Sequence, residues 1–398
     1  MTILLFIMAI NFIFVLLSFY NYQKVYVPFI VTLMVLIMAA CYDVVDYAMY
    51  KSMYENSGYM GYTIESILSD SNNLYSPDKG YALINELFLD TGFSYVEFRF
   101  IISVVCLFIL WRIASKITHS IVLVFSLYMI VPFFFDAMQV RNFYAAVFLF
   151  IAVYVYSKYV RVDQDDLNYH LYSPDFRGVL YFITIMLIGT SVHKILFFYL
   201  PFFLYDYLQS KRFSKYICMS FSVIGMMLPI YSGILQGNVA LTNFLFENAT
   251  NEGMERLATY SSLEINPLRM WFDWSYLLLM LIVLGYVLKH LKYYSAPILT
   301  VRYVHTVRQL FFYLTLTLPL LAMAPNMGRI YRNIMLMGYI AIAAYFDYCK
   351  VRYRPIKLII LFVFVAIIGY GELYYTYGNA ALDVLNNNYI MDYLGISK

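Results

Sequence analysis

The chain has 398 residues with a formal net charge of +3, and it is 63% hydrophobic, 20% aromatic and only 13% charged. Because an ordinary soluble domain carries about 25% charged residues, this composition excludes a typical soluble protein and predicts an integral membrane protein. The four cysteines form no C-x-x-C pair, and the sequence has no P-loop, Rossmann fingerprint or H-E-x-x-H motif. The sequence therefore indicates no disulfide framework, no bound metal or cofactor, and no ATP-driven pump.

Apolar segments recur along the whole chain, which predicts one all-α polytopic integral membrane domain over residues 1–398. Each segment is a candidate membrane-spanning helix. We count about twelve of them, at residues 2–20, 25–42, 98–112, 120–135, 142–157, 178–192, 194–209, 216–235, 271–288, 309–324, 328–347 and 358–376.

The loops between these segments divide into two sets that alternate along the chain. One set carries 17 Lys and Arg with 6 acids, whereas the other carries 10 Lys and Arg with 18 acids. Since basic loops stay on the cytoplasmic side of a membrane, the basic set is predicted to be inside and both termini outside. The small net charge of the chain therefore conceals a strong polarity between its two faces.

Residues 179–208 test this topology, because they form one apolar stretch interrupted by the polar sequence Gly189–Lys194. A single span here would place two later basic loops outside, against the charge rule. Two short spans of about 15 residues preserve the rule, and each covers roughly 22 Å of a ~30 Å hydrocarbon core. The turn with His193 and Lys194 is therefore expected to lie below the outer surface.

Two predicted outer loops, 43–97 and 236–270, are long enough to act as lids or substrate-binding elements. The first contains an amphipathic stretch near 81–89, and the second is expected to contain a short helix near 251–260. Tyrosines and acids in these loops suit sugar rings, which stack on aromatic faces and offer hydroxyls to carboxylates. Interfacial anchoring nevertheless explains most of the 43 tyrosines of the chain.

Basic side chains lie beside the predicted outer ends of three helices, where positive charge is unusual. Arg141 begins the fifth segment, His193 and Lys194 begin the seventh, and Arg329 and Arg332 begin the eleventh. A helix N-terminus with an adjacent arginine is a site for anions. Arginine also binds pyrophosphate through forked donors without losing its proton. Since Arg329 and Arg332 are three residues apart, we expect them on one helix face, and we assign the arginines and Lys194 as candidate pyrophosphate ligands.

Each of these residues also has an ordinary structural explanation. Arg141 could be a snorkelling helix end, or it could be neutralised by Asp136 across a short turn. The two later arginines could pair with acids of the loops. His193 could be a structural hydrogen-bond donor, and Lys194 gives the weakest signal. The group is more specific than any member, although the sequence does not place its members together in space.

Asp43 and Asp46 follow the second segment at i and i+3, at the rim of the predicted outer face. Either could accept a proton from an attacking hydroxyl as a general base. Most acidic residues in loops simply solvate a surface, and no pair has a spacing that indicates a glycosidase-type acid and base. The rival acids are Asp78, Glu86, Asp136 and Glu255.

Five short motifs occur in the order Asp43-Val-Val-Asp-Tyr47, Asp78-Lys-Gly-Tyr81-Ala-Leu-Ile-Asn85, Gln139-Val-Arg141-Asn142, Ser191-Val-His193 and Gly328-Arg-Ile-Tyr-Arg332. This order resembles the EpsG family, bacterial polytopic proteins of exopolysaccharide, capsule and O-antigen loci that are related in role to Wzy polymerases. The likeness spans residues from about 1 to 347. The chain departs from the family where Ala40-Cys41-Tyr42 replaces the usual Arg and Gly-Thr, where Asp78 replaces a glutamate, and where Asn142 replaces a glutamine.

The resemblance implies glycosyl transfer at the outer leaflet of the bacterial cytoplasmic membrane, without a metal. The donor would be a chain on undecaprenyl pyrophosphate, and the acceptor would be the terminal sugar of a second lipid-linked repeat unit. The three arginines would neutralise the leaving pyrophosphate, while Asp43 or His193 would orient or deprotonate the acceptor hydroxyl. A chain-length regulator or flippase of the same pathway is the expected protein partner. The candidate sugar-binding residues are Asp46, Asp78, Tyr81 and Tyr331.

Other classes of membrane protein share some of these features. A flippase for lipid-linked oligosaccharides would also use about twelve helices and a cationic cavity, but it should show internally repeated halves, and we see no convincing repeat. A ligase that moves a glycan to another acceptor would share the donor site. A membrane acyltransferase fits a histidine in a hairpin, but its cytosolic thioester donor suits the opposite face.

Overall fold

The computed structural model of the protein describes residues 12–13, 23–44, 46–59, 78–162, 171–209, 216–217, 219–224, 227, 267–318, 328–377, 383–384 and 387–393. These residues form helices, with one small antiparallel sheet of β1 (Val160–Val162) and β2 (Leu171–Pro174). The predicted all-α class holds for the described residues apart from this sheet.

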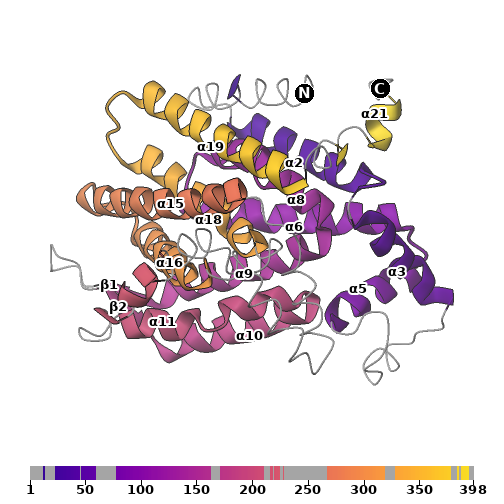
Figure 1. Ribbon diagram of the computed structural model, residues 1–398, viewed down its shortest axis with the longest axis horizontal. Coiled ribbons are helices and arrows are strands. Elements are labelled where there is room, and N and C mark those ends of the chain that lie inside the picture. The colour runs from indigo at the N-terminus through magenta and orange to yellow at the C-terminus, as the bar shows by residue number, and fades with distance from the viewer. Residues whose placement is uncertain are drawn as a thin grey trace.

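Long apolar runs produce the helices, which the sheet interrupts once between α9 and α10. Figure 1 shows their arrangement. In chain order they are α2 (Gln23–Ala40), α3 (Tyr47–Tyr59), α5 (Lys79–Asp90), α6 (Tyr95–Ile117), α7 (Ile121–Ile130), α8 (Phe133–Met138), α9 (Val140–Tyr159), α10 (Phe176–Val192), the 3₁₀ helix η2 (Lys194–Tyr199), α11 (Phe202–Gln209), α15 (Pro267–Tyr293), α16 (Ile298–Leu314), the 3₁₀ helix η3 (Thr315–Thr317), α18 (Arg329–Tyr348), α19 (Arg354–Tyr377) and α21 (Tyr389–Tyr393).

The predicted segment at 120–135 is two helices rather than one. Val131 is extended, with φ −159° and ψ 134°, so α7 ends before it and α8 begins after Pro132. Proline has no N–H to donate and disfavours the helical conformation of the residue before it. The break creates the short helix α8 directly before α9, and α8 carries Phe135 and Asp136.

The predicted segment at 309–324 also has different boundaries. Helix α16 begins earlier, at Ile298, so Arg302 and Arg308 are helical instead of belonging to a loop at 289–308. The buried positions of α16 include Val304, Val307 and Phe311, which recur at helical spacing. A search for continuous apolar runs misses this start, because arginines and a histidine dilute the hydropathy of an amphipathic helix.

Some predictions fall where the structure offers no description. The segment at 2–20, apart from residues 12 and 13, and the short helix near 251–260 lie outside the described residues. The segment at 216–235 is described only at its start. The amphipathic stretch near 81–89 is described, and it is helical as part of α5.

The described chain contains three helices that are long and apolar enough to cross a membrane, Tyr95–Ile117, Val140–Tyr159 and Trp274–Tyr293. Shorter apolar helices are Val25–Ala40, Ile121–Ile130 and Phe176–Val192. Helices of this length and composition identify a membrane protein. The count of twelve spans and the outside location of both termini stay predictions.

Exposed apolar side chains form stripes along the outer helices. On α6, Phe100, Val104 and Phe108 are exposed and lie at successive i, i+4 positions. On α19, the exposed apolar residues are Ile356, Ile359, Ile360, Val363 and Ile367. Such large stripes are unfavourable in water and ordinary against lipid tails, so these helix faces form the lipid-facing surface.

The centre of the fold is formed by α7, α8 and α18. Every residue of α7 and α8 is buried, and so is every residue of α18 from Ile330 to Phe346. Helix α18 packs against α7, α15 and α16, while α9 packs against α6, α10 and α16. Two of the helices that begin with predicted anion ligands, α9 and α18, therefore lie inside the bundle rather than on its rim.

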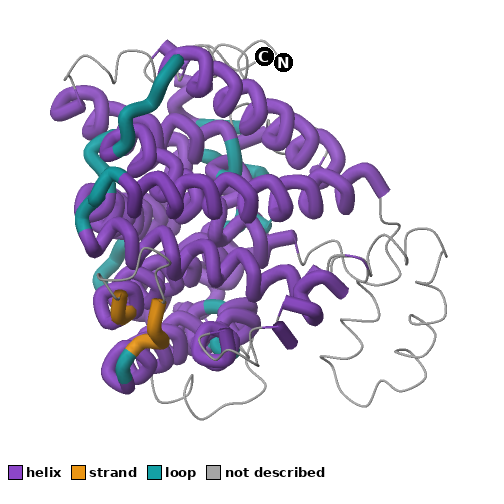
Figure 2. Tube along the Cα trace, turned by 90° about the vertical axis from the view of Figure 1, so that its left-hand side faces the viewer, coloured by secondary structure: helices purple, strands orange, loops and turns teal. Residues whose placement is uncertain are grey.

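The two ends of the molecule differ in structure. Figure 1 places β1 and β2 at one end, and α3 and α5 at the opposite end. Figure 2, viewed from the strand side, shows the strands in front of the helical bundle. The candidate site lies at the end that carries α3 and α5, because those helices supply Tyr50 and Tyr81 to it and Asp78 directly precedes α5.

Candidate functional site

A reciprocal amide pair joins the two helices that begin with arginine motifs. Asn142 Nδ2 donates to Asn333 Oδ1 over 2.8 Å, and Asn333 Nδ2 donates to Asn142 Oδ1 over 3.2 Å. Asn142 directly follows Arg141 on α9, and Asn333 lies four residues after Arg329, one helical turn along α18. The pair therefore holds the N-termini of α9 and α18 side by side.

Arg141 forms a buried ion pair with Asp78, which comes from the start of α5. Arg141 Nη1 lies 2.8 Å from Asp78 Oδ2, and the residue Asp78 is only 3% exposed. The other oxygen of the carboxylate, Oδ1, accepts from the backbone N–H of Lys194 over 3.2 Å. The partner of Arg141 is therefore Asp78, and not Asp136 as one structural explanation of the sequence suggested.

Two tyrosine rings form the walls around this arginine. The Arg141 guanidinium carbon lies 5.2 Å from the ring centroid of Tyr50 and 5.9 Å from that of Tyr81. Both rings are buried, which strengthens cation–π attraction by excluding water. Tyr81, predicted to contact sugar, lies beneath the arginine instead of on an open surface.

His193 lies at the junction between α10 and η2, close to both arginine helices. Its Nδ1 accepts from the backbone N–H of Ile195 over 3.3 Å, so in the neutral ring this hydrogen bond assigns the proton to Nε2. The charges of Arg141 and Arg329 both act on the ring. His193 is thus arranged to donate a hydrogen bond from Nε2 rather than to take a proton there.

Arg329 belongs to the same group of side chains. Burial raises the pKa of the Tyr50 hydroxyl, while Arg141 and Arg329 lower it and Asp46 and Asp78 raise it further. The net effect keeps the phenol protonated at neutral pH, since an unperturbed tyrosine already titrates near 10. The charges that act on Tyr50 come from the α2–α3 turn, the residue before α5, α9 and α18, so these parts of the chain lie near one another.

Three donors of this cluster have no partner within the described part of the chain. Arg141 Nε, Arg329 Nε and His193 Nε2 are all buried, and none makes a hydrogen bond to the described residues. A buried donor without an acceptor costs about 1–3 kcal/mol, so three in one place require an explanation. Because the charges of both arginines act on His193, a bound anion is one explanation for these donors.

Arg332 faces a different environment from Arg329. Its guanidinium lies over Phe135, 4.4 Å from the ring centroid, and its charge acts on Asp136. Arg332 therefore has neighbours of its own in the core, and the joint binding of one anion by Arg329 and Arg332 stays a prediction. Positions i and i+3 are about 60° apart around a helix, and in a packed core this angle directs the two side chains to different neighbours.

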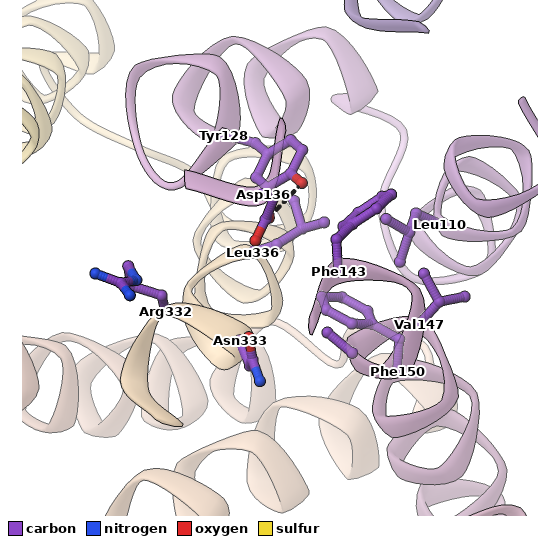
Figure 3. Close-up of a pocket in the computed structure, with 10 residues that line it drawn as sticks. Leu110, Tyr128, Asp136, Phe143, Val147, Phe150, Arg332, Asn333 and Leu336 are labelled. Atoms are coloured by element: carbon purple, nitrogen blue, oxygen red, sulfur yellow. Dashed lines mark hydrogen bonds between the residues drawn. The ribbon is translucent and has the colours of Figure 1, made fainter. Parts of the chain in front are cut away.

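Arg332 also lines a small cavity in the core, shown in Figure 3. The cavity has a volume of about 10 Å³, near the lower limit for holding one water molecule. Within it, the Tyr128 hydroxyl donates to Asp136 Oδ2 over 2.6 Å. Arg332 and Asn333 leave α18 in different directions in Figure 3, so only Asn333 reaches toward α9.

The turn between α2 and α3 carries both predicted general bases. Asp43 and Asp46 have positive φ angles of 49° and 68°, a region that aspartate tolerates better than most residues. Asp46 is half-buried, and its charge acts on Arg141. Asp43 is exposed and lines a separate hollow. The turn therefore presents one carboxylate to the arginine cluster and the other to open space.

We call this space the Tyr42 hollow. It has a volume of about 430 Å³. The rings of Tyr42 and Tyr389 lie 4.5 Å apart, and the Tyr42 hydroxyl donates to Asp392 over 2.6 Å. Helix α21 is held beside it, since the Tyr42 N–H donates to the Asn387 carbonyl over 2.8 Å. The lining residues are Tyr42, Asp43, Tyr47, Ala48, Lys51, Ser52, Glu55, Asn56 and Tyr389.

The remaining predicted ligands occupy other positions. The Lys194 side chain is exposed, and this residue serves Asp78 through its backbone N–H. Tyr331 is buried in the core, where its hydroxyl is 2.8 Å from Thr317 Oγ1. These placements separate Arg141, Arg329, His193, Asp78 and Tyr81, which the structure brings together, from Asp43, Arg332 and Tyr331, which have other neighbours.

Sequence reasoning missed Arg99 on α6, which is 1% exposed. Its guanidinium donates to the carbonyls of Met38, Cys41 and Ala137, the latter two over 3.1 Å each. These carbonyls lie at the C-terminal ends of α2 and α8, where a cation is favourable. Arg99 thus joins the end of α2, where the α2–α3 turn begins, to the end of α8. A charge inside an apolar helix was the available signal.

No group of three His, Cys, Asp or Glu side chains in the described ranges is placed to hold a metal ion. The site chemistry available from those residues is that of arginine, histidine, tyrosine and aspartate. Such a set can neutralise an anion, donate hydrogen bonds to it and accept a proton nearby.

Lipid-facing stripes and a buried donor cluster define a helical membrane protein with a candidate anion site. A family model matches residues 24–393, nearly the whole chain, and the chain belongs to the EpsG family. No curated protein and no solved structure matches the chain significantly.

Proposed function

We propose that the protein is a polysaccharide polymerase, a membrane glycosyltransferase that joins repeat units linked to undecaprenyl pyrophosphate at the outer leaflet of the bacterial inner membrane. Membership of the EpsG family supports a polymerase-like role in polysaccharide biosynthesis and a lipid-linked saccharide as substrate. The observation that carries the proposal is the convergence of Arg141, Arg329 and His193, whose buried donors lack partners among the described residues.

The proposed reaction is a displacement at the anomeric carbon of the donor chain. The acceptor hydroxyl oxygen forms the new glycosidic bond, and the bond between the anomeric carbon and the pyrophosphate oxygen breaks. Negative charge grows on the leaving pyrophosphate, where Arg141 and Arg329 neutralise it and His193 Nε2 donates a hydrogen bond. Each such donor contributes about 3–4 kcal/mol to transition-state stabilisation in comparable sites.

The proton of the acceptor hydroxyl needs a base on the other side of the reacting carbon. Asp43 is the proposed base, because it lines the Tyr42 hollow and is exposed to an incoming sugar. Asp46, on the same turn, is close enough to Arg141 for their charges to interact. The turn therefore connects the space for the acceptor with the cluster for the leaving group.

The Tyr42 hollow is the proposed position of the acceptor sugars. Tyr42 and Tyr389 present aromatic surface, while Asp43, Glu55 and Asn56 offer polar groups for sugar hydroxyls. Its volume lies within the usual range of about 300–1,000 Å³ for ligand pockets. Tyr331 is not retained as a sugar ligand in this proposal, since its hydroxyl is engaged with Thr317 in the core.

Alanine substitution of the two clustered arginines tests the function. Arg141→Ala and Arg329→Ala should each abolish long polymer in a producing strain while the protein remains in the membrane at normal abundance. Arg352→Ala is the matched control, because Arg352 is exposed and donates to Tyr353 outside the cluster. Normal chain length in both cluster variants would refute the proposal.

A further inference from the structure

Asp78 makes contacts that are unusual for its position at a helix start. It is the residue immediately before α5, the N-cap, where aspartate normally accepts hydrogen bonds from the first amides of its own helix. Its side chain makes no such bond. Instead it reaches across to Arg141 and to the Lys194 amide. The contact with its own helix has been exchanged for a contact with the arginine cluster.

The surroundings of the Asp78 carboxylate are those of a bound anion. One oxygen meets a guanidinium at 2.8 Å and the other meets a backbone N–H at 3.2 Å. Arg141 Nε, Arg329 Nε and His193 Nε2 are buried nearby without partners among the described residues. A carboxylate has two oxygens, so it satisfies only part of this donor set. An anion with more oxygens would satisfy more of it.

We propose that Asp78 is an internal counter-anion, which occupies a phosphate position in the unliganded protein and is displaced by the diphosphate of the donor. This inference rests on the proposed function, which makes a lipid-linked pyrophosphate the donor. The incoming diphosphate displaces the carboxylate from Arg141 and takes its place.

Charge explains why a diphosphate displaces Asp78 from Arg141. The cluster contains Arg141 and Arg329, and both Asp46 and Asp78 act on Arg141. A monovalent anion that displaced Asp78 would replace one negative charge beside Arg141 with another, so the charge at the arginine would not change. A diphosphate brings more negative charge and more acceptor oxygens than the carboxylate that it displaces. Competition with Asp78 therefore lowers the affinity for every anion, and the extra charge and oxygens of a diphosphate make it the stronger competitor.

The displaced carboxylate has a second position available. At the N-cap it can accept from an amide in the first turn of α5, which is the common role of aspartate there. Asp78 thus has two mutually exclusive sets of partners, one in the empty site and one in the occupied site. This alternative lowers the cost of breaking the pair with Arg141 and couples occupancy of the site to the first turn of α5.

The test measures binding of inorganic pyrophosphate and orthophosphate to the purified full-length protein in lipid nanodiscs at ~0.15 M ionic strength. Asp78→Asn keeps the shape of the side chain but removes its charge. We expect this variant to bind pyrophosphate at least about 5-fold more tightly than wild type, the lower end of usual coupling effects. Orthophosphate binding should tighten by a similar factor, because both anions compete with the same carboxylate. Equal or weaker pyrophosphate binding, or no binding by either protein, would overturn the proposal.

Asp46→Asn is the matched control, because it removes the same charge from the same cluster, whereas the ion pair of Arg141 is formed with Asp78. Asparagine also tolerates the positive φ of 68° at this position. We expect less than about a 2-fold change, since a charge not in contact is screened more strongly. If Asp46→Asn increased the affinity for pyrophosphate as much as Asp78→Asn does, the effect would be one of charge in general. That result would overturn the proposal that the diphosphate displaces Asp78.

A measurement on the wild-type protein avoids reliance on the folding of any variant. Added pyrophosphate should slow hydrogen exchange of the first-turn amides of α5, because the displaced Asp78 becomes their cap. Unchanged exchange at saturating pyrophosphate would overturn the exchange of partners. Neither readout requires polymerisation, so a protein that passes both tests but forms no polymer would refute the proposed function and leave the counter-anion intact.

Discussion

The Asn142–Asn333 pair offers the sharpest test of how the two arginine helices are held together. We consider Asn142→Leu, Asn333→Leu and the double substitution, in which leucine fills a similar volume without polar atoms. Each single variant leaves one buried amide facing an apolar side chain. The double variant removes both amides, so no polar group is left without its partner.

The expected magnitude follows from the two hydrogen bonds. Interhelical bonds in membrane proteins contribute about 0.6 kcal/mol on average and up to about 1.7 kcal/mol. Two reciprocal bonds therefore predict a coupling free energy of roughly 1.2 kcal/mol between the positions. Each single substitution should lower the free energy of unfolding by about 1–3 kcal/mol. The double substitution should lower it by less than the sum of the two single effects, and the difference is the coupling free energy.

Reversible unfolding in lipid–detergent mixtures measures all four proteins of the cycle. The free energies of unfolding should be non-additive by more than about 0.5 kcal/mol. Additive effects would refute the reasoning, because they would show that the two amides do not act as a pair. The single variants should also bind pyrophosphate more weakly than wild type, since Arg141 and Arg329 would no longer be held side by side.

Three further outcomes are expected. Arg99→Lys should lower the free energy of unfolding by about 2 kcal/mol in the same assay, because lysine cannot span the carbonyls that the guanidinium fork reaches. Gly80→Ala should destabilise by about 1–3 kcal/mol and reduce polymer formation in cells, since its Cβ would lie 2.9 Å from the backbone of α10. Gly285→Ala would meet only side-chain atoms of Arg308, the nearest at 3.6 Å, and should be neutral in both assays. Tyr389→Ala should weaken binding of the delipidated repeat-unit oligosaccharide by about 10-fold in saturation-transfer NMR, because a lost aromatic contact costs roughly 1.4 kcal/mol. Tyr393 lies on the same helix and is 90% exposed, so Tyr393→Ala should leave this binding unchanged.

Helices were predictable from the sequence where burial and apolar composition coincide. The runs that became α2, α6, α9 and α18 are continuous, and no proline breaks them near the middle of the predicted segment. The prediction failed at 120–135, where Pro132 was visible but its effect on the preceding residue was not applied. It failed again at α16, because a half-polar helix inside a bundle has little mean hydropathy although its buried positions are regular.

The site was predictable in its residue types but not in its pairings. Positive charge at predicted outer helix ends singled out Arg141, Arg329 and His193, which the structure brings together. The pairing of Arg141 with Asp78 spans a distance in sequence that no local pattern reports. Arg332 shows that local spacing is also insufficient. Its separation of three residues from Arg329 predicts the angle between the two side chains around the helix, but it does not predict which residues of other helices Arg332 contacts.

Reconstitution tests the central claim most directly. The purified protein is placed in liposomes with its lipid-linked repeat unit as the only saccharide, and the products are separated by chain length. Wild type should produce a ladder of elongated lipid-linked chains, and Arg329→Ala should leave the repeat unit unextended. Movement of the repeat unit across the bilayer without elongation, or an equal ladder from Arg329→Ala, would contradict the account.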